Sequence, residues 1–198
     1  NLSDYEKQTL NKLTYFINKT FKRFDNDFNI VKRKMFNHKD SKDARELMMS
    51  FQKRKKLLNN CVNKCQAVLK ILKEEQFNKC IIYNEFIDFA NNLSAYLMIN
   101  GLENFVYHSN IKKKELILEQ FKNSNSKILI CVKALDEGLN IPDLDLGIIT
   151  SSSSQERQTI QRVGRVLRYQ KDKKAKIYNI YVSGSKEELW LRKRTAGL

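Results

Sequence analysis

The chain has 198 residues, which is enough for one domain or for one domain with a helical extension. Its hydrophobic content of 41% and charged content of 30% exclude an intrinsically disordered polypeptide. The 37 lysines and arginines outnumber the 22 acidic residues, so the formal net charge is +15. Such a surplus favours a polyanionic partner such as nucleic acid, although a solvated, lysine-rich surface gives the same balance.

Residues 1–76 contain no glycine or proline and predict a helical lead-in. Apolar residues recur at three- and four-residue spacing from Leu10 to Phe21, which is typical of amphipathic helices. Ser3, with Glu6 three residues later, predicts a capping box at the start of the first helix. The chain begins with asparagine inside this pattern, so we expect it to be a piece of a longer protein.

A basic segment lies within the lead-in, at residues 32–56, and contains the run "QKRKK". Such a run is most often a solvated helix face or a loop. The alternative is a surface that follows the phosphates of a nucleic acid. The sequence leaves both interpretations open.

The four cysteines do not have the spacing of a zinc site. Cys80 and Cys131 lie in apolar runs and are predicted to be small buried residues. Cys61 and Cys65 have helical spacing and lack a second pair of ligands. We therefore expect no metal, and a reducing compartment. The sequence has no signal peptide and no apolar stretch long enough to span a bilayer.

From residue 79 onward, strands alternate with helices. Apolar strands are predicted at 79–84, 104–109, 127–132, 144–151 and 175–184, and helices at 85–101, 111–125, 154–169 and 185–194. This alternation predicts an α/β fold with a parallel sheet covered by helices on both faces. Function in such sheets gathers at the carboxyl ends of the strands, so the loops after Tyr83, Tyr107, Val132 and Thr150 are the candidate site.

The six glycines nowhere form the phosphate-binding loop Gly-x-x-x-x-Gly-Lys-Ser/Thr. This chain alone therefore lacks the usual means of holding the phosphates of ATP. Asp136 and Glu137 resemble an acidic metal-binding pair, but they lie several residues beyond the strand and have no phosphate loop to serve.

The stretch "QRVGRVLR" places three arginines, Arg162, Arg165 and Arg168, on one helix face. Like charges this close together repel each other unless an anion lies opposite. Carboxylates within the protein are one candidate, and a phosphate is the other, since the planar guanidinium suits phosphate oxygens. Gly164 costs about 1 kcal/mol in a helix interior, which favours close approach of another group at this point.

The order of motifs resembles the second RecA-like lobe of superfamily 2 helicases and translocases. "QRVGRVLR" is similar to motif VI, "VKALDEGLNIP" to motif V, "CIIYNEF" to motif IV, and "YHSNIKKKELILEQF" to the motif that follows it. The resemblance implies a RecA-like lobe over residues 77–198, preceded by the helical segment 1–76.

The resemblance implies that Arg165 and Arg168 are arginine fingers, which reach the γ-phosphate of ATP held mainly by a first lobe. It also implies a cofactor-binding group around the nucleotide, made up of Gln161, Arg162, Gly138 and Asn140. Gln161 and Arg162 would couple the nucleotide state to the interface between lobes. The implied cofactor is ATP with Mg²⁺.

The resemblance implies nucleic-acid contacts for four residues: Asn84, Ser109, Lys112 and Lys133. Motif V of this family often begins with a threonine on a backbone phosphate, whereas this chain has Val132 and Lys133 there. Lys133 is therefore the better phosphate contact. His108 is interpreted as a hydrogen-bonded structural residue.

These motifs together predict the second motor lobe of an ATP-dependent helicase or translocase, inactive as an isolated piece. The expected partners are a first lobe of the same protein and a nucleic acid. DNA is favoured over RNA, because Gln161 opens motif VI as in repair, restriction and phage relatives. That likeness favours a cytoplasmic prokaryotic or viral protein, or a nuclear one in a eukaryote. The alternatives are a non-catalytic binding platform and the ATPase part of a restriction or antiviral nuclease.

Overall fold

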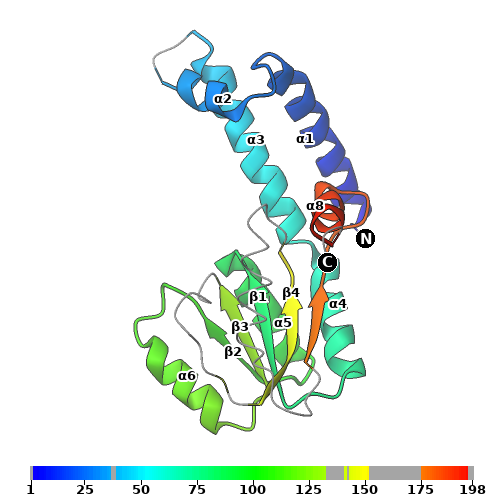
Figure 1. Cartoon of the computed structure of the whole chain (residues 1–198), viewed down its shortest axis with the longest axis vertical. Helices are drawn as coiled ribbons and strands as arrows, with labels where there is room; N and C mark the ends of the chain where they lie inside the picture. The colour runs from blue at the N-terminus through cyan, green and yellow to red at the C-terminus, as the bar shows by residue number, and fades with distance from the viewer. Residues whose placement is uncertain (1, 37–38, 133–140, 142, 152–174, 196–198) are drawn as a thin grey trace. The chain divides into compact units, whose positions relative to one another are not determined.

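The chain divides into two compact units, residues 1–61 and residues 62–198 (Figure 1). The computed structural model describes residues 2–36, 39–132, 141, 143–151 and 175–195. The sequence places its boundary later, between residues 76 and 77, and that division into domains stays a prediction. No helix among the described residues is both long and apolar enough to cross a membrane.

The first unit consists of three helices: α1 (Asp4–Lys22), α2 (Phe28–Lys34) and α3 (Ser41–Asn59). The predicted capping box is confirmed, since the Glu6 backbone N–H donates to Ser3 Oγ and the Ser3 N–H donates to the Glu6 carboxylate. Asp25 and Asn26 turn the chain after α1 in the left-handed region, which short polar side chains tolerate.

The core of this unit lies between α1, α2 and α3. Its fully buried members are Ile17, Phe24, Val31, Ala44 and Leu47. Phe21, Phe28 and Phe51 add a cluster of aromatic rings with centroids 4.7 to 5.4 Å apart. This part of the predicted helical lead-in therefore has a small hydrophobic core of its own.

The second unit is a five-stranded parallel sheet with helices on both faces. Its elements are α4 (Val62–Glu74), β1 (Lys79–Asn84), α5 (Ile87–Ile99), β2 (Asn104–Tyr107), α6 (Lys114–Asn123), β3 (Ile128–Val132), β4 (Leu144–Ile149), β5 (Lys176–Asn179) and α8 (Lys186–Thr195). The strand order is β2-β3-β1-β4-β5, and all four pairings are parallel. The predicted α/β fold is thereby confirmed. The predicted helix at 154–169 lies outside the described residues.

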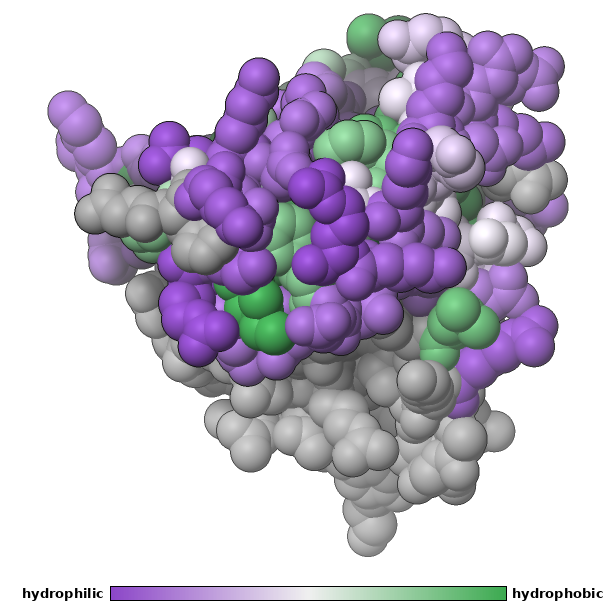
Figure 2. All heavy atoms as spheres, turned by 90° about the horizontal axis from the view of Figure 1, so that it is seen from above, coloured by the Kyte–Doolittle hydropathy of each residue, from purple (hydrophilic) through white to green (hydrophobic). Residues whose placement is uncertain are grey.

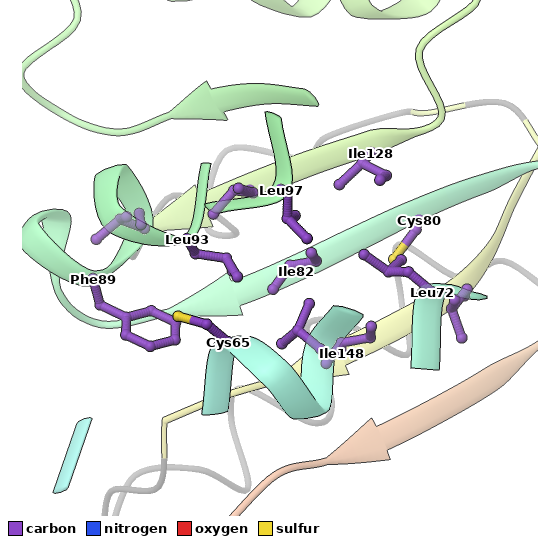
Figure 3. Packing of buried hydrophobic residues seen from close by; sticks show 14 residues of the cluster. Cys65, Leu72, Cys80, Ile82, Phe89, Leu93, Leu97, Ile128 and Ile148 are labelled. Atoms are coloured by element: carbon purple, nitrogen blue, oxygen red, sulfur yellow. The ribbon is translucent and has the colours of Figure 1, made fainter. Parts of the chain in front are cut away.

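Alternate residues of β1 and β3 enter two separate cores, as the period of a strand requires. Cys80 and Ile82 of β1 point toward α4 and α5, where they meet Leu72, Leu93 and other apolar side chains (Figure 3). Ile81 and Tyr83 belong to the opposite core, which includes Phe121 of α6. Burial on both faces explains why the strands appear in the sequence as nearly continuous apolar runs.

Lys79, the first residue of β1, binds the carboxyl end of α6 through its side chain. Its Nζ donates to the Phe121 carbonyl at 2.6 Å and lies 4.3 Å from the Phe121 ring centroid. The same ammonium group lies 3.4 Å from the carbonyl oxygens of Ser124 and Ser126. These carbonyls follow the last turn of the helix, where a cation is favourable.

Replacing Lys79 with methionine should destabilise the chain by about 2 kcal/mol, because the α6 carbonyls lose a charged donor and the ring loses its cation. Urea unfolding followed by circular dichroism measures the change. Lys122→Met, at an exposed position on the same helix, is the matched control and should change stability by less than about 0.5 kcal/mol. Equal effects of the two substitutions would contradict this role of Lys79.

Candidate functional site

The carboxyl ends of all five strands lie at one edge of the sheet, because every pairing is parallel. The strands end there at Asn84, Tyr107, Val132, Ile149 and Asn179. The predicted candidate site consists of the loops that follow four of these ends. The described ends of the strands therefore lie at the edge where the site is predicted.

Asn84 and Thr150 join the ends of β1 and β4. The Asn84 side-chain Nδ2 donates to Thr150 Oγ1 at 2.8 Å, and Thr150 Oγ1 donates to the Tyr83 carbonyl at 2.9 Å. Asn84 Oδ1 accepts the backbone N–H of Phe86 at 2.7 Å. Asn84 and Thr150 are completely buried, so these bonds fix the shape of the edge from within.

Lys64 of α4 and Glu187 of α8 form a buried ion pair beside this junction. Lys64 Nζ lies 2.9 Å from Glu187 Oε1 and donates to the Thr150 carbonyl at 2.8 Å. The second oxygen, Glu187 Oε2, accepts the backbone N–H of Val182 at 2.9 Å. The two side chains are 2% and 1% exposed, so both charges are withdrawn from water and depend on each other.

Burial raises the pKa of Glu187 above its ordinary value, because the loss of hydration outweighs the attraction of Lys64. The Ser185 hydroxyl accepts the Glu187 backbone N–H at 3.1 Å and donates to the Val182 carbonyl at 2.6 Å. The start of α8 is thus tied to the end of β4 by the Lys64 ammonium and to its own preceding turn by Ser185.

The loop after β2 differs from this buried junction, because its polar side chains are exposed. It carries Ser109 and Lys112, both of which are open to solvent. Ser109 Oγ donates to Asn110 Oδ1 at 3.3 Å, and the Asn110 backbone N–H donates to His108 Nδ1 at 3.2 Å. His108 therefore shapes the loop through a hydrogen bond, as its interpretation as a structural residue requires.

The predicted site residues fall into three groups. Ser109 and Lys112 are accessible at the edge, whereas the described contacts of the Asn84 amide are internal to the lobe. The others lie outside the described residues: Lys133, Gly138, Asn140, Gln161, Arg162, Arg165 and Arg168. Their predicted roles, like the nucleic-acid contact of Asn84, stay predictions.

Lys64 and Glu187 belong to the candidate site in the structure, but the sequence did not predict them. Lys64 lies on the same helix face as Cys65, Val68 and Leu72, which are all buried. The position of this lysine within an apolar stripe could have predicted, from the sequence alone, that Lys64 is buried. Glu187 gives no such signal, because acidic residues are ordinary in the first turn of a helix.

The described residues contain no cluster of three or more His, Cys, Asp and Glu side chains that could hold a metal ion. The four cysteines form no disulfide and are buried, which confirms the burial predicted for Cys80 and Cys131. Burial raises the pKa of both of these thiols well above the ordinary range, so they stay protonated and packed.

The basic segment 32–56 is not one continuous surface. Lys53, Lys55 and Lys56 are exposed, but Arg54 between them is only 8% exposed and its guanidinium lies 5.4 Å from the Phe51 ring centroid. Burial lowers the pKa of Arg54. Figure 2 looks onto the end of the helical unit that carries α2, and hydrophilic side chains cover most of that face. The segment thus combines a polar surface with one internal arginine.

Comparison with known proteins identifies the family to which the chain belongs. The profile of the helicase conserved C-terminal domain matches residues 63–170, which is more than half of the chain and includes the ends of four of the five strands, β1 to β4. The chain is 28% identical over 153 residues to the DNA 3'-5' translocase XPB2 of Sulfurisphaera tokodaii, covering 77% of this chain and 34% of that protein. It is 33% identical over 89 residues to the pre-mRNA-processing ATP-dependent RNA helicase PRP5 of Kluyveromyces lactis, covering 44% of this chain and 11% of that protein.

The fold has solved counterparts. The C-terminal part of the Fun30 ATPase domain superposes with a TM-score of 0.68 at 15% identity, covering 97% of this chain and 86% of that one. The likeness includes the helical unit as well as the sheet. The chain spans about a third or less of the curated relatives described above.

Replacing Lys64 with methionine should destabilise the chain by about 3–5 kcal/mol, because Glu187 is left buried without a counter-charge. The double change Lys64→Met/Glu187→Leu should recover most of this loss, since it removes both charges. Urea unfolding of the native chain, both single variants and the double variant measures the coupling. Additive costs would contradict a linked pair.

The cost of Lys64→Met should also fall as the pH is lowered from neutral toward about pH 5. The raised pKa of Glu187 means that the folded chain holds this proton more tightly than the unfolded chain does. Lys64 lowers this pKa, so without Lys64 the penalty on ionised Glu187 is larger than in the native chain, and protonation of Glu187 relieves more of it. The same urea experiment at the two pH values tests this, and a cost that rises on acidification would contradict it.

Replacing Lys53, Lys55 and Lys56 with glutamine together tests the basic segment, with buried Arg54 left intact. If the segment follows phosphates, the slope of log affinity against log salt for single-stranded DNA should fall by about 2. Fluorescence anisotropy of a labelled oligonucleotide over a salt series gives this slope. An unchanged slope would favour the alternative interpretation, a solvated helix face.

Proposed function

Since the chain belongs to the helicase conserved C-terminal domain family, we propose that it is the second motor lobe of an ATP-dependent nucleic-acid helicase or translocase. The observation that carries this proposal is the match over residues 63–170, which includes the ends of β1, β2, β3 and β4 and the segment with the arginines. The first lobe of the same protein supplies the phosphate loop and the ligands of Mg²⁺.

In this proposal Arg165 and Arg168 act as arginine fingers on the γ-phosphate of ATP. Fingers of this kind are worth about 10³–10⁵ in rate in well-studied GTPases. Gln161 and Arg162 link the nucleotide state to the interface between lobes, and Gly138 and Asn140 lie near the nucleotide. The buried junction at Thr150 supports this assignment, because it fixes the end of β4, the last described strand before the arginines in the sequence.

The lobe holds the sugar-phosphate backbone of a nucleic-acid strand at the carboxyl edge of the sheet. Ser109 and Lys112 are suited to this role, since both are exposed beside the end of β2. Lys133 follows β3 and adds a second cation. Asn84 acts from beneath this surface by fixing the junction of β1 and β4. Binding of this kind is salt-dependent and largely independent of base sequence.

The nucleic acid is DNA in this proposal, and the protein works in the cytoplasm of a prokaryote or its virus. The first relative supports DNA, because its name describes a DNA translocase. The PRP5 relative is named as an RNA helicase, so the assay below includes both nucleic acids.

Replacing Arg168 with alanine in the full-length parent protein should lower nucleic-acid-stimulated ATP turnover by about 10³ or more, with ATP binding largely kept. Steady-state turnover with and without single-stranded DNA or RNA, and equilibrium binding of a fluorescent ATP analogue, are the measurements. Arg23→Ala is the matched control, because Arg23 forms only an exposed ion pair with Asp43 and should change turnover little.

Turnover that does not depend on Arg168, or no turnover by the native parent protein, would contradict the motor and favour a binding platform. Stimulation by RNA but not by DNA would overturn the choice of DNA and leave the motor in place.

A further inference from the structure

Helix α1 has two faces of opposite character. Its inner face packs in the core of the helical unit through Ile17, Thr20 and Phe21. On the outer face, Tyr5 is 78% exposed and Tyr15 is 71% exposed. A tyrosine usually buries most of its ring, so two rings this exposed on one helix call for an explanation.

The two tyrosines share a stripe with lysines. With 3.6 residues per turn, seven exposed residues of α1 fall within an arc of roughly 100° on the side away from the core, namely Asp4 and six residues that we call the tyrosine–lysine stripe. This tyrosine–lysine stripe consists of Tyr5, Gln8, Lys12, Tyr15, Lys19 and Lys22. It is about 25 Å long, because its ends are 17 residues apart at about 1.5 Å per residue.

We propose that the tyrosine–lysine stripe binds a single strand of nucleic acid, as a site separate from the edge of the sheet. The inference rests on the proposed function only for the class of ligand. Exposed aromatic rings stack on bases of any sequence, and lysines between them pair with the intervening phosphates. Both kinds of group alternate here along one rigid helix.

The positive charge of the stripe favours a strand of nucleic acid as its partner over an apolar helix or a second copy of the chain. The stripe carries Lys12, Lys19 and Lys22, and the nearest acidic residue on that side is Asp4 at its amino end. An apolar partner helix would bury these ammonium groups without counter-charges. A second copy of the chain, with its own net charge of +15, would be repelled. A polyanion with flat apolar bases satisfies both the lysines and the rings.

Helix α1 is a suitable support for such a site. It is 19 residues long, its start is fixed by the capping box at Ser3, and its inner face is anchored in a well-packed core. The rings and ammonium groups are therefore presented in a fixed register before any ligand arrives. Pre-organisation of this kind lowers the entropy cost of binding.

The test separates stacking from charge in the complete 198-residue chain. Binding is followed by fluorescence anisotropy with a labelled oligothymidylate of about 20 nucleotides, longer than most single-strand sites. Tyr5→Ala/Tyr15→Ala should weaken binding about tenfold or more without changing the salt slope. Tyr5→Phe/Tyr15→Phe keeps the rings and should bind like the native chain.

Neutralising the three lysines tests the charge. Lys12→Gln/Lys19→Gln/Lys22→Gln should lower the salt slope by about 2. The matched control, Lys73→Gln/Lys122→Gln/Lys127→Gln, removes the same charge from exposed positions of the second unit and should leave the slope nearly unchanged. All substituted positions are exposed, so circular dichroism and thermal melting should show native folding.

Native-like binding by both the tyrosine-to-alanine and the stripe-lysine variants would overturn the proposal. So would equal binding of inorganic polyphosphate, since a polyphosphate has no bases to stack, and so would no binding of the oligonucleotide by the native chain. None of these outcomes decides the motor function, which is judged by ATP turnover of the full-length parent protein and its dependence on Arg168. The two proposals can therefore fail separately.

Discussion

One buried ammonium group, that of Lys64, holds together the edge of the sheet on which the site is built. It is withdrawn from water and compensated by the Glu187 carboxylate and the Thr150 carbonyl. Through these two contacts it joins a helix that precedes the sheet, the end of a central strand and the last helix. A buried cation must be compensated by closely placed hydrogen-bond and charge partners. If one of them moves away, the free-energy cost of desolvating the cation is no longer offset. The three elements are thus constrained to one arrangement at the end of β4, which precedes the arginines in the sequence.

The sheet was predictable from the sequence, because parallel strands buried on both faces must be apolar at nearly every position. "KCIIYN" and "KILICV" satisfy this requirement, and each became a strand next to the other in the centre of the sheet. The ends of elements were less predictable. The strand expected at 175–184 is confined to Lys176–Asn179, because beyond Asn179 the chain leaves the ladder after one further bond, from Ile180 to the Ile149 carbonyl.

The candidate site was predictable only where a motif is local in the sequence. Ser109 and Lys112 follow a strand end and are exposed, as a strand-end loop implies. Lys64 and Glu187 are 123 residues apart. The apolar stripe around Lys64 indicates that it is buried but not which residue it pairs with, and Glu187 on its own resembles a solvated helix residue. Their pairing depends on the sheet that brings α4 and α8 together, so no local pattern contains it. Asn84 shows the converse, because a polar residue at a strand end can serve the protein interior rather than a ligand.

The basic composition of the chain is divided among different physical roles. Lys64 and Arg54 are buried, Lys79 closes the end of a helix, and the lysines of α1 lie in solvent beside exposed rings. Net charge alone therefore overstates the surface available to a polyanion. What remains lies at the loops of the sheet, along the basic segment 32–56, and on the outer face of α1. On α1 the cations Lys12, Lys19 and Lys22 share one face with two exposed rings, so a strand that carries both phosphates and bases matches this face better than a ligand that carries charge alone.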